Sequence, residues 1–174
     1  FNRELLPMLS PMGLDPAHPF PRILNKSLNF IVSLKGKDAF GRSNGMAIVQ
    51  APRALPRVVA LPSTIAQSDH DYVLLSSIIQ AYVSDLFPGM TAACCFQFRI
   101  TRNSDLFVDD EEVDDLLRAM VGELEQRNYG AAVRLEIAHN APQELADYLS
   151  DQFNLAEQDI YRCQGPVNLA RLMT

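Results

Sequence analysis

Two arginines at the end of a predicted strand are the residues best suited to chemistry in this chain. Arg99 and Arg102 lie on either side of Thr101, and Asn103 follows directly. A guanidinium group presents a planar fork of N–H donors that matches the oxygens of a phosphate. An ion pair with nearby Asp105 or the acidic residues after it is the commoner arrangement. Arg99 and Arg102 are therefore candidates for phosphate contact, with pairing inside the protein as the alternative.

Residues 36–43 come within one residue of a phosphate-binding P-loop, because Arg42 stands where that motif has lysine. A P-loop also needs a helix directly after the glycine-rich segment, since backbone N–H groups at the helix N-terminus hold the phosphate. Asn44, Gly45 and an apolar stretch follow here instead. This pattern predicts the loop of a β-hairpin.

An acidic run and three separate histidines are weaker candidates. Residues 109–115 include six carboxylates, but they open a predicted helix, where negative charge favours the helix dipole. The run also lacks the glycine spacing of a calcium-binding EF-hand. His18, His70 and His139 have no histidine or cysteine partner at metal-ligand spacing. We therefore expect no catalytic, cofactor-binding or metal-binding residue in this chain.

The composition predicts a soluble, cytoplasmic globular protein. Hydrophobic residues make up 48% and charged residues 21% of the 174 residues, as in ordinary folded domains. The net charge of −6 argues against nucleic acid as a partner, because such proteins present basic surfaces. No apolar run approaches the roughly 20 residues of a membrane span. The three cysteines, Cys94, Cys95 and Cys163, form no disulfide framework and suit a reducing cytosol.

Periodicity predicts an α+β fold with mixed, largely antiparallel sheet(s) and about three to four helices. The expected strands are 28–34, 46–50, 57–61, 96–100, 133–137 and the short edge strand 159–163. The expected helices are 76–87, capped by Ser76 or Ser77, then 109–128, 142–153 and the start of one at 168–173. The proline-rich residues 7–22 predict an extended connector, and 64–71 a surface loop.

Alternation along the strands also predicts which side chains are buried. The strand 28–34 is expected to be half-buried, and 57–61 to be buried. In the next strand Phe98 is expected in the core and Gln97 at the surface. Apolar side chains around 19–23 and 169–173 are expected to be exposed and to mediate association.

The chain is expected to form one domain over residues 1–174, with two subdomains joined near 63–71 as a further possibility. It begins with Phe1, and its first residues have the pattern of the tail of a helix. We therefore expect an internal piece of a longer protein.

Several segments together resemble one family, the middle or "head" domain of type 1 polyphosphate kinases. In chain order they are PMLSP at 7–11, DPAHPFP at 15–21, NKSLN at 25–29, LPRVVALP at 55–62, LFPG at 86–89, FRITRNSDL at 98–106, VRLE at 133–136, IYR at 160–162 and GPVNL at 165–169. The ordered set is more specific than any single segment and spans nearly the whole chain.

The resemblance implies a segment of an enzyme that transfers the γ-phosphate of ATP to polyphosphate through a phosphohistidine, with magnesium. It also implies that the N-terminal and C-terminal catalytic domains lie outside residues 1–174, since nothing here matches the catalytic histidine, the phosphate-binding arginines or the metal ligand. This segment would then be a scaffold and subunit-contact domain without a cofactor of its own. Its partners would be the remaining domains and a second subunit of a homo-oligomer. The alternative is a free-standing, non-enzymatic binding or regulatory α+β domain.

Overall fold

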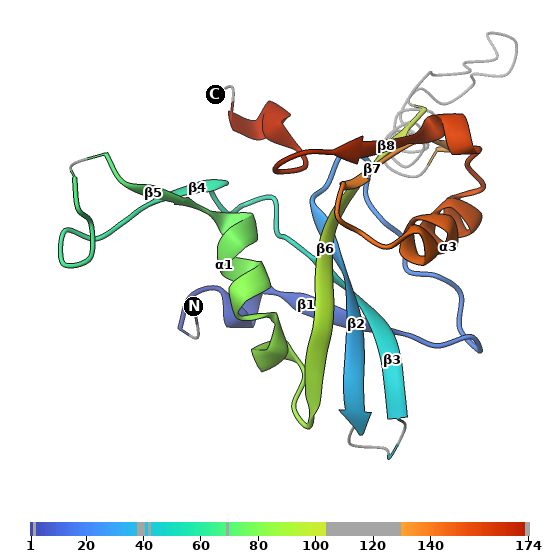
Figure 1. Ribbon diagram of the computed structural model, residues 1–174, viewed down its shortest axis with the longest axis horizontal. Coiled ribbons are helices and arrows are strands. Elements are labelled where there is room, and N and C mark those ends of the chain that lie inside the picture. The colour runs from blue at the N-terminus through green and yellow to red at the C-terminus, as the bar shows by residue number, and fades with distance from the viewer. Residues whose placement is uncertain (2, 38–40, 42, 69, 104–129, 173–174) are drawn as a thin grey trace, which may run out of the picture.

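A six-stranded sheet is the centre of the fold. The computed structural model of the chain describes residues 1, 3–37, 41, 43–68, 70–103 and 130–172. The strand order in the sheet is β1-β3-β2-β6-β7-β8, while β4 and β5 pair apart from it. Figure 1 shows α1 and α3 on opposite sides of β6, so the described part of the chain forms three layers.

The elements follow one another from the N-terminus, and η denotes a 3-10 helix. They are η1 (Leu6–Met8), β1 (Ser10–Leu14), β2 (Asn29–Lys37), β3 (Ser43–Gln50), β4 (Val58–Ala60), β5 (Tyr72–Leu74), α1 (Leu75–Ala81), η2 (Val83–Leu86), β6 (Met90–Arg102), β7 (Ala132–Ala138), α3 (Gln143–Phe153), η3 (Glu157–Asp159), β8 (Ile160–Cys163) and η4 (Leu169–Leu172). Neighbouring strands of the large sheet are antiparallel, except that β7 and β8 are parallel and joined through α3. The sheet is therefore mixed.

The prediction of three to four helices is wrong, because the described residues contain two α-helices, α1 and α3. The segment 76–87 is α1 only as far as Ala81; Tyr82 leaves the helical region and η2 completes the segment. The segment 168–173 forms only the single turn η4, since 3-10 geometry is poor at extending itself. The helix predicted over 109–128 lies outside the described residues.

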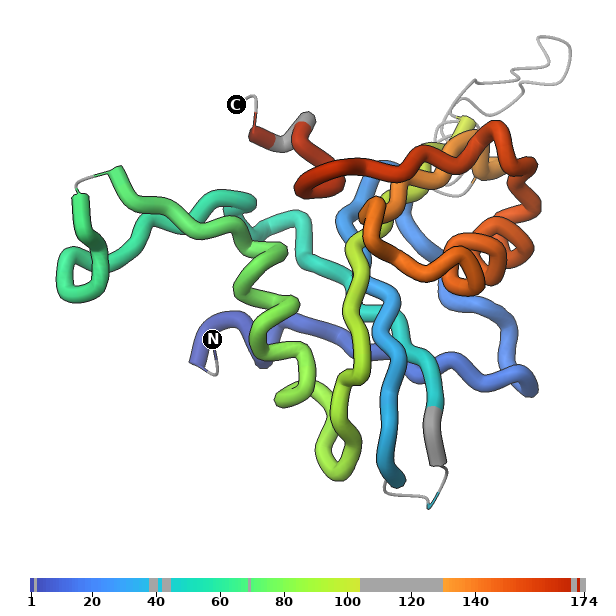
Figure 2. Tube along the Cα trace, in the orientation of Figure 1, coloured from blue at the N-terminus to red at the C-terminus, as the bar shows by residue number. Residues whose placement is uncertain are grey.

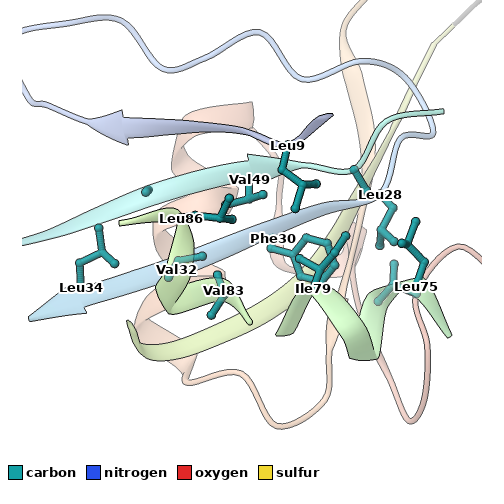
Figure 3. Close-up of a cluster of buried hydrophobic side chains, with 13 residues drawn as sticks. Leu9, Leu28, Phe30, Val32, Leu34, Val49, Leu75, Ile79, Val83 and Leu86 are labelled. Carbon is teal, nitrogen blue, oxygen red and sulfur yellow. The ribbon is translucent and has the colours of Figure 1, made fainter. Parts of the chain in front are cut away.

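One face of the sheet packs against α1 and η2. Phe30 and Val32 of β2 meet Leu75 and Ile79 of α1, and Val49 of β3 joins them. Figure 3 shows these side chains pointing into one layer between the helix and the strands. The predicted caps Ser76 and Ser77 lie inside α1, whose N-cap is Leu74 and has no side-chain cap. Strand β5 thus runs directly into the helix.

The opposite face packs against α3. Ile31 of β2, Phe98 of β6 and Ile137 of β7 form its core with Ala146 and Leu149 of the helix. The prediction that 28–34 is half-buried is therefore wrong: alternate residues of β2 enter two different cores, because a helix covers each face. The helix predicted over 142–153 is confirmed as α3.

Gln97 also contradicts the predicted surface position, since it is only 8% exposed on the α1 side of β6. Its Nε2 donates to Oε1 of Gln80 in α1 at 3.3 Å. Its Oε1 accepts from the backbone N–H of Val167 at 3.3 Å. A buried amide with two partners is a structural link, so Gln97 ties the helix and the segment after β8 to the same strand.

Strands β1 and β8 form the two edges of the sheet. The first lies in the proline-rich segment 7–22, and the second in the short strand predicted at 159–163. Residues 7–22 are not only a connector, because β1 pairs with β3, Met12 opposite Ile48. Pro11 is tolerated there because β1 is an edge strand and one side of it makes no ladder bonds. At the other edge β8 confirms the predicted short edge strand.

Strands β4 and β5 form a ribbon that extends away from the large sheet (Figure 2). The prediction of a buried strand at 57–61 is wrong: Val58 is 37% exposed, and Tyr72, which pairs with Ala60 across the ribbon, is 58% exposed. The turn between the strands contains Ile65, which is 65% exposed. The division of the domain into two subdomains near 63–71 stays a prediction.

Two glycines allow a close approach between the end of β2 and the start of β6. Gly36 has φ of +116°, and a Cβ built on it would lie 3.0 Å from the carbonyl oxygen of Gly89. Gly89 itself has φ of +83°. A larger residue at Gly36 would therefore clash with backbone and strain its own conformation.

The buried register of β6 gives a stability prediction. Phe98→Ala should lower the free energy of unfolding by about 3–5 kcal/mol, because a fully buried ring leaves a cavity. Gln97→Ala should cost about 1–3 kcal/mol, since it leaves the buried N–H of Val167 and the part-buried amide oxygen of Gln80 without their partner. Urea unfolding of the 174-residue chain measures both.

Val133→Ala is the control, because Val133 is 47% exposed on β7 and its truncation should cost about 0.5 kcal/mol or less. A Gln97→Ala midpoint equal to that of Val133→Ala would show that the amide contributes nothing.

Candidate functional site

The candidate Arg99 lies in an ion-pair cluster on β6 and β7. Arg99 faces Glu136 directly across the two strands. Its Nη1 is 3.2 Å from Oε2 of Glu136, and the side chains are 14% and 15% exposed. Arg134, two residues earlier on β7, reaches the other carboxylate oxygen at 3.0 Å. One carboxylate therefore neutralises part of the charge of two guanidinium groups, and the cluster keeps a positive charge.

Tyr161 of β8 supports the outer arginine. The guanidinium carbon of Arg134 lies 3.7 Å from the centre of the Tyr161 ring. Glu136 stands opposite Tyr161 in the parallel ladder, so the ring and the carboxylate hold Arg134 between them. Stacking on an aromatic face fixes the plane of the guanidinium and hence the direction of its donors.

A cavity of about 360 Å³ lies beside this cluster. Its walls are Arg99, Glu136 and the segment 163–169 that follows β8. Asn168 on that segment is 7% exposed and has φ of +70°, in the left-handed region. The hydrogen bond from Val167 to Gln97 holds the segment over this polar end of the sheet. Arg99 therefore forms part of the wall of this cavity, and its side chain is largely buried.

Arg102 lies elsewhere and is engaged by backbone carbonyls. Its Nε donates to the carbonyl of Ile23 at 3.1 Å and its Nη1 to that of Gly130 at 2.9 Å. Its guanidinium also lies 5.7 Å from the centre of the Phe153 ring. Arg102 therefore joins three distant segments of the chain. Phosphate contact by Arg99 or Arg102 stays a prediction, and the structure does not bring the two together.

Cys95 and Cys163 do not have the lowered pKa of a nucleophilic cysteine. Burial, and then the neighbouring Cys94, raises the pKa of Cys95 to about 12. Burial also raises the pKa of Cys163, Glu136 adds to this, and Arg134 and Arg99 oppose it. Because the thiolate is the reactive form, Cys95 and Cys163 are held in their unreactive form at neutral pH.

The three histidines are separate. His18 lies 3.6 Å from Asp15 at a cavity of about 620 Å³ that Phe20 and Tyr148 also line. His70 and His139 are exposed. Within the described residues no group of three histidine, cysteine or acidic side chains could hold a metal ion. The acidic run 109–115 lies outside the described residues.

The segment that resembles a P-loop joins two antiparallel strands, β2 and β3. Strand β3 begins at Ser43, where a P-loop would begin its helix. The predicted hairpin is therefore confirmed, and the phosphate-holding helix end that a P-loop requires is replaced by a strand.

Sequence reasoning selected Arg99 but missed Arg134, Glu136, Tyr161 and Asn168. The sequence indicates that Glu136 lies on the opposite face of its strand from its apolar neighbours Leu135 and Ile137. That it lies opposite Arg99 follows only from the pairing register of β6 and β7. Asn168 gave no signal, because its role depends on the return of the chain after β8.

Comparison with known proteins assigns the chain to a family. The model of the polyphosphate kinase middle domain matches residues 1–174. The chain is 55% identical over 174 residues to a polyphosphate kinase of Pseudomonas aeruginosa and 59% identical over 172 residues to one of Neisseria gonorrhoeae, covering 100% and 99% of this chain. It belongs to the polyphosphate kinase middle domain family.

A solved structure agrees with this assignment. The crystal structure of polyphosphate kinase from Porphyromonas gingivalis has a TM-score of 0.72 to this chain, at 25% identity, and the match covers 99% of this chain and 23% of that one. The chain spans about a quarter of the length of the curated relatives it matches, 25% for both named above. In the part of the chain that the structure describes, no helix is long and apolar enough to cross a membrane.

The ion-pair cluster gives a second stability prediction. Glu136→Gln should lower the free energy of unfolding by about 2 kcal/mol, because it leaves two partly buried guanidinium groups facing each other without a carboxylate. The urea midpoint of the variant at neutral pH measures this.

Glu157→Gln is the matched control, since Glu157 is exposed. A loss no larger than that of the control would mean that the cluster contributes no net stability.

Proposed function

We propose that this chain is the scaffold and subunit-contact segment of a longer polyphosphate kinase. The observation that carries the proposal is that the whole chain matches one domain family while spanning about a quarter of its relatives. The remaining domains of the same enzyme would be its first partners. In the relatives this segment is part of a longer chain, which favours this function over a free-standing binding or regulatory domain.

The reaction we propose for the whole enzyme is transfer of the ATP γ-phosphate to polyphosphate through a phosphohistidine, with magnesium and in the cytoplasm. Phosphoryl transfer depends on positioning and on neutralising charge, so it needs a rigid frame around the reacting groups. A sheet buried on both faces supports the role of frame. The chemistry would belong to residues outside this chain, because its histidines stand apart from its arginine cluster.

Homo-oligomeric contact is the second part of the proposal. Of the two apolar regions predicted to be exposed, 19–23 is so only in part, since Pro19 is exposed but Ile23 is fully buried. At the other region, Leu169 is 52% and Leu172 41% exposed. The ribbon adds Ile65 and Tyr72, at 65% and 58%. Clusters of exposed apolar side chains of this kind favour contact with other protein surfaces.

The first prediction from this proposal concerns labelling. The 174-residue chain, incubated with magnesium and ATP labelled on the γ-phosphate, should neither make polyphosphate nor retain label. The physical reason is that, in the described part of the chain, none of the three histidines lines the cavity beside Arg99. Arg162, which lies next to His139, is engaged by the backbone carbonyls of His139 and Ala141. A stable phosphohistidine at any of the three would place chemistry in this chain and overturn the scaffold assignment.

The second concerns association. Sedimentation of the chain across a concentration series should show a rising apparent mass, because the exposed apolar side chains can cover one another. Leu169→Ser together with Leu172→Ser should reduce the effect, while Glu157→Gln should leave it unchanged. A strictly monomeric chain at millimolar concentration would count against subunit contact through this segment.

A further inference from the structure

The cavity beside Arg99 contains more hydrogen-bond donors than acceptors. Nε of Arg99, Nε of Arg134 and Nδ2 of Asn168 are buried donors that lack a hydrogen-bond partner within the described structure. Against these three donors stands one buried acceptor without a hydrogen bond, Oε2 of Glu136, which is ion-paired with Nη1 of Arg99 at 3.2 Å. A buried N–H without an acceptor is costly, and native proteins rarely leave one. Two of these donors belong to residues that line the same cavity, Arg99 and Asn168. The missing component of the site is therefore an acceptor.

The charges around the cavity favour a negatively charged acceptor. Arg99 and Arg134 share the single carboxylate of Glu136, at 3.2 and 3.0 Å. Arg134 contacts Oε1 of Glu136 and is held there by its stacking on Tyr161. The carboxylate therefore neutralises only part of the positive charge of Arg99. A neutral acceptor such as water would satisfy a donor but leave the excess positive charge.

We propose that this cavity binds a phosphate-sized oxyanion, with Arg99 and Asn168 as its donors and Arg134 as the second cation that offsets the charge of Glu136 in the cavity wall. The guanidinium fork of Arg99 suits two oxygens of such an anion. At about 360 Å³ the cavity is at the lower end of the range for ligand sites, which suits a small ligand. A scaffold needs no ligand, so this inference goes beyond the proposed function.

The segment after β8 is built to keep Asn168 in place. Asn168 adopts φ of +70°, which asparagine tolerates better than other residues with a side chain. Val167, the preceding residue, is fixed to Gln97 through its backbone N–H. The amide of Asn168 is therefore presented at the cavity by a backbone that is fixed to the sheet one residue earlier.

Asn168→Gly is the test variant, because glycine accepts the left-handed backbone and removes only the amide. The 174-residue chain is titrated by calorimetry with inorganic phosphate and separately with tripolyphosphate, at constant ionic strength. The wild-type chain should bind, and Asn168→Gly should bind about tenfold more weakly, since it loses a hydrogen bond to a charged group. Arg99→Lys, which keeps the charge but loses the fork, should also weaken binding.

Asn154→Gly is the matched control, because Asn154 has φ of +53° at the end of α3 and does not line this cavity. It should bind as the wild-type chain does. Thermal unfolding of each variant without ligand checks that it is folded, and phosphate should raise the unfolding midpoint of the wild-type chain more than that of Asn168→Gly.

Binding of both probes supports a site for a free oxyanion, and binding of tripolyphosphate alone supports a site for a phosphate within a chain. Absence of binding by a folded wild-type chain, or equal binding by folded Asn168→Gly, overturns the proposal and assigns the cavity to water. These outcomes are independent of the labelling and sedimentation experiments, so the site and the scaffold function can fail separately.

Discussion

Burial of the central strands on both faces is the constraint on which the rest of this structure depends. Phe30 and Ile31 are adjacent in β2 and point to opposite faces, yet both are fully buried. Such a strand is stable only if each face has its own cover, so the chain must supply α1 on one side and α3 on the other. The β7–α3–β8 crossover and the β5–α1 junction are the two connections that deliver them.

The covering helices do not extend across the whole sheet, and the polar cluster occupies the remainder. On the α1 side, β6 passes from Cys95 and Gln97, close to the helix, to Arg99, which faces Glu136 instead. Tyr161 and the segment after β8 take over the covering there. The same strand therefore carries apolar packing, a buried amide and an ion pair in succession, each suited to what lies above it.

Short-range patterns predicted the strands well and their environment less well. The alternation at Phe98 and Ile100 located β6, because period two survives whatever covers the strand. The same alternation placed Gln97 in solvent, since sequence cannot show that Gln80 and Val167 will return to it. Arg99 was found because the chemistry of a guanidinium group can be recognised from the residue type alone. Asn168 became relevant only because the chain after β8 returns to the sheet, where Val167 bonds to Gln97, 70 residues earlier in the sequence. The predicted number of helices was too high at 168–173, where residues of helical composition form only the single turn η4.

The attachment of β8 has a mechanical consequence. This strand is the outermost of the sheet and is held by a four-residue parallel ladder, while the antiparallel strands inside it have longer ladders. Beyond β8, the described backbone–side-chain link to the sheet is the one between Val167 and Gln97. A pull or twist applied to residues 164–172 would therefore act directly on the walls of the Arg99 cavity and, through Val167, on the apolar core of the α1 side. Strand β8 and the segment after it therefore form a more compliant margin on a stiffer sheet.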